Sequence, residues 1–196
     1  MDLTMINDAA RAVHLLGLAL GFGVAIMADL SAARLLVRPL DDREVDMLHA
    51  YHRTVALGLM LFWASGLVLI WLRTGFQPDN FSPKLMAKLG IVTLLTVNAI
   101  MIGRIGLRTL ETWHGARFGA IPFAERARLS ALAGLSGAGW ISALVLGVFS
   151  QMKTMDWDTL SEIIGVIYLL GLTGALAAAV LSPVLLFLMD RRHRVF

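Results

Sequence analysis

Residues 163–189 read IIGVIYLLGLTGALAAAVLSPVLLFLM, a run without a single charged side chain. A helix needs roughly 20 residues to cross the hydrocarbon core of a bilayer, and this run is long enough. Backbone groups in lipid must find their hydrogen bonds within the segment, which a helix achieves. The stretch therefore predicts a transmembrane helix.

Four further apolar stretches precede this one, at residues 13–36, 54–72, 85–105 and 129–152. None shows the alternating pattern of about ten residues that is typical of a transmembrane β-strand. No internal repeat or linker divides the chain. We therefore expect an all-α, polytopic membrane bundle of about five transmembrane helices, forming one domain over residues 1–196.

The composition agrees with a lipid environment. The chain is 58% hydrophobic and 16% charged, whereas soluble domains have about 45–50% apolar and about 25% charged residues. The net charge of +3 does not indicate nucleic-acid binding, because the arginines cluster at helix ends rather than on one face. The absence of cysteine excludes disulfides, iron–sulfur clusters and thiolate metal sites.

Local signals mark three helix starts. Asp41 and Glu44 have the spacing of a capping box, so the second helix is expected to begin in water and continue into the membrane. The Ser82-Pro83 pair supplies the N-cap of the third helix and a proline at its first helical position. Thr159 is expected to begin the fifth helix.

The basic residues predict an orientation. Twelve lie in the two loops and the tail on one side of the bundle, and five lie on the other side. Because basic loops remain in the cytoplasm, we expect the N-terminus outside the cytoplasm and the C-terminus inside. The cytoplasmic set consists of Arg34, Arg38, Arg43, Arg53, Arg104, Arg108, Arg117, Arg126, Arg128, Arg191, Arg192 and Arg194.

Ionisable side chains within a span are costly and mark candidate functional sites. Asp29 lies near the inner end of the first helix, His14 near its outer end, and Lys88 in the first turns of the third. Both helices begin outside, so His14 and Lys88 are expected at a similar depth. Gly17 and Gly21 share the helix face of His14, and a histidine above small residues suits a flat macrocycle such as haem.

Each of these features has an alternative interpretation. The Gly-x-x-x-Gly spacing also packs helices closely, with His14 bonded to a neighbouring carbonyl. Lys88 either extends to the headgroups, as Lys84 one turn earlier would, or faces the bundle and pairs with a haem propionate. Asn98, deeper in the third helix, either bridges two helices or contacts a ligand.

The other histidines, His49, His52, His114 and His193, fall on the cytoplasmic side. They are about 30 Å from His14 across the bilayer, so none of them can share one haem with it. The spacing of His49 and His52 could chelate a metal, but two ligands make a weak site. We therefore expect these two residues to lie on a solvated helix face beside Arg53.

Three short stretches resemble a known group of membrane proteins. They are HLLGLALGFG at residues 14–23, YHRT at 51–54 with the apolar helix that ends in ASG at 64–66, and KLMAKLGIVTLL at 84–95. Here the chain is similar to the superfamily of bacterial copper-resistance D proteins and the HemJ-type protoporphyrinogen IX oxidase. In that group a first-helix histidine and a third-helix lysine in an A-K-L context mark the cofactor region. His14 and Lys88 fall on those positions.

The resemblance implies haem b as cofactor, the bacterial cytoplasmic membrane as location, and oxidation of protoporphyrinogen as one activity. It covers the first three helices, about half of the chain. The second helix lacks the methionine–proline element of the HemJ-type proteins. Asn98 matches the copper-resistance D pattern, but Ala99 follows it in place of the usual arginine.

The sequence thus predicts a haem b-binding membrane protein, redox-active as an oxidase or in electron transfer at the outer side. His14 is its metal ligand, Gly17, Gly21 and Asn98 contact the cofactor, and Lys88 is both a cofactor contact and the catalytic cation. One alternative is a copper or small-solute transporter, although no Met-x-x-x-Met pair or two-fold repeat supports it. Another is a non-catalytic subunit, with a second copy or a larger membrane complex as partner.

Overall fold

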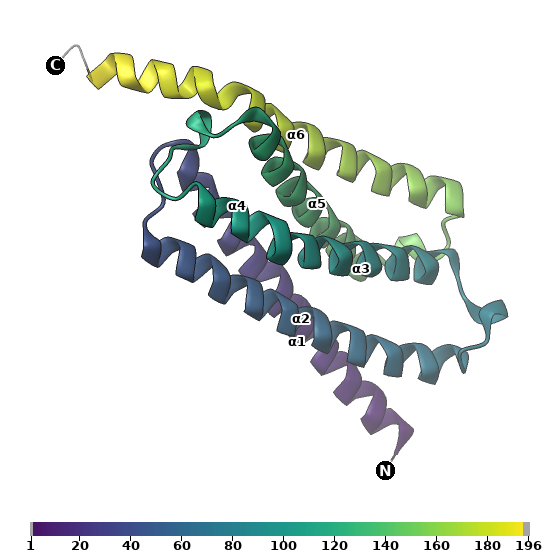
Figure 1. Cartoon of the computed structure of the whole chain (residues 1–196). Coiled ribbons are helices and arrows are strands. Elements are labelled where there is room, and N and C mark those ends of the chain that lie inside the picture. Colours follow the sequence, from purple (N-terminus) through teal and green to yellow (C-terminus); the bar gives the residue numbers. More distant parts are fainter. Residues whose placement is uncertain (1, 194–196) are drawn as a thin grey trace.

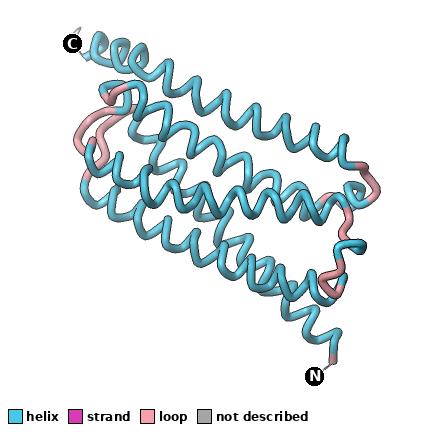
Figure 2. Tube along the Cα trace, turned by 45° about the vertical axis from the view of Figure 1, so that its right-hand side comes forward, coloured by secondary structure: helices cyan, strands magenta, loops and turns pink. Residues whose placement is uncertain are grey.

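The computed structural model describes residues 2–193, which form helices joined by short connections and contain no strand. Figure 1 shows the path of the chain, and Figure 2 shows that the loops are confined to the two ends of the bundle. The main helices are α1 (Leu3–Ala33), α2 (Asp42–Thr74), α3 (Pro83–Met101), α5 (Phe123–Val148) and α6 (Trp157–His193). The short α4 (Leu107–Thr112) continues α3 after a π-helical turn, η3 (Ile102–Gly106).

Five helical segments are long and apolar enough to cross a membrane, which confirms the predicted all-α fold with five spans among the described residues. They are Leu3–Leu36, Asp42–Thr74, Pro83–Thr112, Phe123–Val148 and Trp157–Leu188. Each helix begins before the apolar run from which its span was predicted, because its first turns lie outside that run. Arg194, one of the arginines that count toward the orientation, lies outside the described residues.

The two ends of the bundle differ in which connections they carry. The N-terminus lies with the α2–α3 and α5–α6 connections, and this end is called the N-terminal end below (Figure 1). The α1–α2 and α4–α5 connections lie at the opposite end together with the C-terminus. Because most of the arginines lie in these connections, in the helix turns next to them or in the C-terminal tail, the opposite end is called the basic end.

Two of the predicted helix starts are confirmed. At α2 the Asp41 side chain accepts a hydrogen bond from the Glu44 backbone at 2.8 Å, and the Glu44 carboxylate accepts one from the Asp41 backbone at 3.2 Å. At α3 the Ser82 hydroxyl accepts a hydrogen bond from the Leu85 backbone at 3.3 Å. Side chains thus satisfy orphan backbone donors at both starts.

The predicted start of the last helix at Thr159 is wrong. The helix begins at Trp157, and the Asp156 carboxylate accepts a hydrogen bond from the Thr159 backbone at 3.0 Å. Hydrogen bonds from the side chain and backbone of Thr159 lower the pKa of the Asp156 carboxyl. An acceptor that stays charged at a helix start also interacts favourably with the helix dipole, which explains why the cap is Asp156.

Helices α1 and α2 approach each other through glycine. A Cβ atom placed on Gly17 would lie 2.8 Å from the Phe62 backbone nitrogen, and one on Gly58 would lie 2.6 Å from the backbone nitrogen of Gly21. The ring of Trp140 from α5 covers Gly21 so closely that a Cβ there would overlap it. The glycine face of α1 is therefore filled by α2 and an indole, and offers no open groove for a macrocycle.

A buried cation joins α5 to the last helix. Pro183 has no N–H, so the Ala179 carbonyl oxygen has no helical donor and instead accepts a hydrogen bond from the Ser182 hydroxyl at 3.0 Å. Arg126, 7% exposed, donates to that same hydroxyl at 3.0 Å and to the Gly119 carbonyl oxygen at 3.3 Å. Arg126 therefore secures the proline site of α6 and the loop beside it.

The glycine contact yields a stability prediction. Gly17→Ala places a methyl group against the α2 backbone, so we expect the free energy of unfolding to fall by about 1–3 kcal/mol. The control is Gly23→Ala in the same helix, where no atom lies within 4 Å of an added Cβ; better helix propensity should leave its stability equal or up to about 1 kcal/mol higher. Thermal unfolding in detergent measures both, and equal midpoints for the two variants would contradict the close approach.

Candidate functional site

A cavity of about 430 Å³ opens among α1, α2, α3 and α5 toward the N-terminal end, and is called the outer cavity below. His14 from α1 and Lys88 from α3 both line it. The structure thus brings together two polar side chains that are far apart in the sequence. The volume falls within the range of ordinary ligand pockets, about 300–1,000 Å³.

Hydrogen bonds define the state of the His14 ring. Its Nδ1 lies 3.0 Å from the Ser65 hydroxyl oxygen, and that hydroxyl donates to the Leu61 carbonyl oxygen at 2.6 Å. Because the hydroxyl hydrogen is used, the Ser65 oxygen accepts from Nδ1–H, and Nε2 then carries the lone pair. The ring also stacks on Phe62 at 3.9 Å between centroids. His14 is held in one orientation and one tautomer.

The charged groups of the outer cavity all have the same sign. Arg11, Arg73 and Lys88 line it, and no acidic side chain among the described residues does. The other lining residues are mostly apolar, and the aromatic ones are Phe62 and Trp63. An apolar body that carries anionic groups is the complementary ligand.

Lys84, one turn before Lys88, has a structural role. Its ammonium donates a hydrogen bond at 2.7 Å to the carbonyl oxygen of Phe149, the C-cap residue of α5, and Lys84 is buried. It does not extend to the headgroups as the sequence suggested. Lys88 is the lysine that lines the cavity.

The other three predicted cofactor contacts do not line this cavity. Gly17 and Gly21 pack against α2 and Trp140, as described above. Asn98 is 2% exposed, and its amide donates to the Leu132 carbonyl oxygen at 3.0 Å, which bridges α3 and α5. It lines a second cavity, and its interpretation as a helix bridge is the one that the structure favours.

Two cations of the outer cavity, Arg11 and Arg73, were not predicted as site residues from the sequence, and neither was Ser65, the hydrogen-bond partner of His14. Arg11 carried a usable signal, since it precedes His14 by three residues and so shares its helix face. Ser65 and Arg73 had no such signal in the sequence, because the direction of their side chains depends on how α2 is rotated about its axis.

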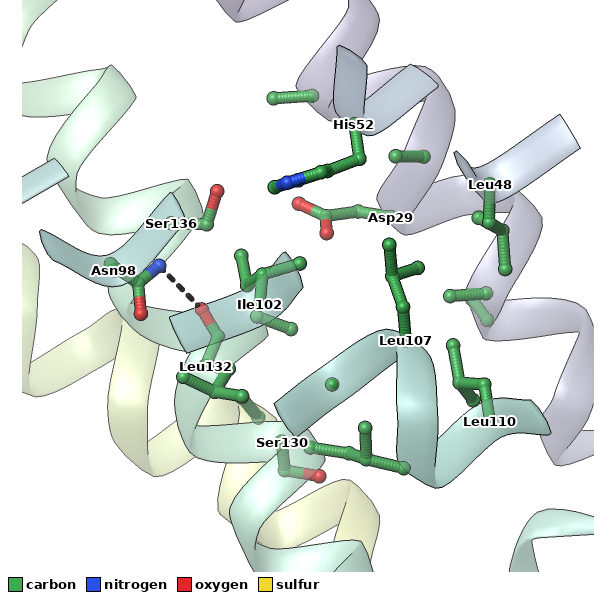
Figure 3. A pocket seen from close by; sticks show the side chains of 18 of the residues that line it. Asp29, Leu48, His52, Asn98, Ile102, Leu107, Leu110, Ser130, Leu132 and Ser136 are labelled. Carbon is green, nitrogen blue, oxygen red and sulfur yellow. Dashed lines mark hydrogen bonds between the residues drawn. The ribbon is translucent and has the colours of Figure 1, made fainter. Parts of the chain in front are cut away.

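The second cavity, of about 250 Å³, lies toward the basic end and is called the inner cavity below. Asp29, His52, Asn98 and Ser136 line it from α1, α2, α3 and α5 (Figure 3). His52 therefore faces the interior of the bundle, whereas a solvated face was expected for it. Only His49 lies on the solvated face, where its Nε2 is 2.7 Å from the Glu111 carboxylate. Among the described residues, no group of three or more His, Cys, Asp or Glu side chains could hold a metal ion.

Comparison of the chain with models of known families, with curated proteins and with solved structures gives no match. The arguments for function therefore come from the two cavities.

The His14 tautomer can be tested directly. Ser65→Ala removes the acceptor at Nδ1, so we expect the ¹⁵N signals of His14 to lose the Nδ1–H pattern in histidine-labelled protein, with His14→Gln providing the assignment. The control is Ser142→Ala, since that buried hydroxyl has no hydrogen-bond partner. Unchanged His14 signals in Ser65→Ala would contradict the assignment.

Proposed function

We propose that the chain is a haem b-binding, redox-active integral membrane protein with His14 as the axial iron ligand. The observation that carries the proposal is the fixed imidazole: Nδ1–H is bonded to Ser65, which leaves the lone pair on Nε2, and His14 lines the outer cavity. When one ring nitrogen of a histidine binds a metal, the N–H of the other ring nitrogen almost always donates a hydrogen bond to a nearby acceptor. The resemblance of three short stretches to the copper-resistance D and HemJ-type proteins is consistent with the proposal.

The residues of the outer cavity fit such a group. Arg11, Arg73 and Lys88 provide cations for the two propionates. Phe62 and Trp63 provide apolar walls that exclude water, and the Trp63 indole is held by a 2.9 Å hydrogen bond to Thr96. A haem bound there would supply the electron-transfer chemistry of an oxidase or electron carrier.

Lys88 has a second role in this proposal. Its ammonium is the titratable cation of the outer cavity, since the guanidinium groups of Arg11 and Arg73 do not release protons. A group that can give and take a proton beside a substrate is what oxidation of a hydrogen-rich compound needs. Lys88 is therefore the proposed catalytic residue.

The proposal includes an orientation and a location. Most of the arginines lie at the helix ends, connections and tail of the basic end, and this distribution favours that end in the cytoplasm. His14 and the outer cavity would then face the outer half of a bacterial cytoplasmic membrane.

The first test is an absorbance spectrum. Protein purified in detergent from haem-replete cells should show a Soret band, and His14→Ala should remove it because the iron loses its ligand. His52→Ala, which changes a histidine of the inner cavity, should keep the band. Purification without haem, or a Soret band that survives in His14→Ala, would overturn the proposal.

Lys88 gives a second test. Lys88→Met removes a charge-assisted contact, so we expect haem to dissociate about tenfold faster or more. The control is Lys153→Met, whose side chain is exposed and does not line the cavity. Transfer of haem to apomyoglobin measures both rates. Equal rates for wild type and Lys88→Met would remove Lys88 from the site.

A further inference from the structure

The inner cavity contains polar groups that the proposed haem site does not use. In Figure 3, Asp29 and His52 both point into the space between the helices, toward Ser136. Neither Asp29 nor His52 forms a hydrogen bond or ion pair among the described residues, although both are partly buried. Unpaired ionisable groups in a membrane-spanning segment are candidates for a binding site.

Asn98 belongs to the wall of the same cavity but offers no acceptor to it. Its Nδ2 donates to the Leu132 carbonyl oxygen, and its Oδ1 is fully enclosed by protein, so a ligand in the cavity cannot reach it. The free side-chain acceptors of the cavity therefore include both Asp29 oxygens.

The π-helical turn η3 shapes one wall. Ile102 and Gly106 line the cavity, and a Cβ on Gly103 would lie 2.6 Å from the Nε2 of His52. The imidazole thus fits directly against the bare backbone of the turn. Single π-turns inside helices are frequent at functional sites.

The inner cavity has an acidic side chain where the outer one has cations. Asp29 is the acidic residue that lines it, and no lysine or arginine among the described residues does. The remaining walls are mostly apolar and include Leu35, Ile102 and Trp140. The complementary ligand has hydrogen-bond donors, a positive charge and an apolar body.

We propose that the inner cavity binds a small amphiphilic amine in its protonated form. The ammonium group donates hydrogen bonds to Asp29 and to neutral His52. The apolar body packs against the alanine and leucine walls from α1, α3 and α5. This site is separate from His14 and does not depend on haem.

The test uses 2-phenylethylamine as the probe and 2-phenylethanol as its neutral counterpart, with affinities measured by calorimetry on the full-length protein in detergent. Wild type should bind the amine at least about tenfold more tightly than the alcohol, since hydrogen bonds to charged groups are among the strong ones. Asp29→Asn, which keeps the shape of the side chain, should remove that preference. Ala99→Leu, which narrows the cavity from α3, should weaken binding of both compounds.

Two controls separate this proposal from other effects. Asp46→Asn changes an exposed acid on α2 and should leave amine binding unchanged. His14→Ala should also leave it unchanged, so that loss of haem and loss of amine binding are distinguishable. The proposal is overturned if wild type binds no amine, if the alcohol binds equally well, or if Asp29→Asn retains the wild-type preference.

Discussion

The close approach of α1 and α2 at Gly17 and Gly58 is the constraint on which the rest of the bundle depends. Lipid gives transmembrane helices no hydrophobic reason to associate, so packing distance and hydrogen bonds must hold them. Contact at the level of the backbone brings His14 within reach of Ser65 and leaves Gly21 as the surface that Trp140 covers. A side chain at either glycine would separate the helices and disturb the orientation of the histidine.

Two cavities in the two halves of the bundle differ in their polar side chains. The outer one has cations and a fixed imidazole, and the inner one has an acidic side chain and a second histidine. One buried hydrophobic cluster borders both, since it includes Ala143 of the outer wall and Trp140 of the inner wall. Each cavity therefore has its own electrostatic character, set by side chains that contact only one of them.

The sequence predicted features that depend on composition along one helix. The five spans, the capping box at Asp41 and the cap at Ser82 follow from local pattern alone. The sequence did not predict how each helix is rotated about its axis. Asn98 was therefore predicted to contact the same cofactor as His14, whereas it lines the inner cavity. His52 was assigned to solvent for the same reason. The π-turn was also missed, because no residue type specifies one.

The hydrogen bond between His14 and Ser65 has a consequence for the order of assembly. Both residues belong to the first two helices, which are synthesised before Lys88 on α3 emerges. The histidine can therefore reach its final tautomer in a simple helical hairpin, while the cationic side of the cavity is completed later. A cofactor that binds His14 at this stage would be in place before α3 packs against the first two helices, and would help to position α3.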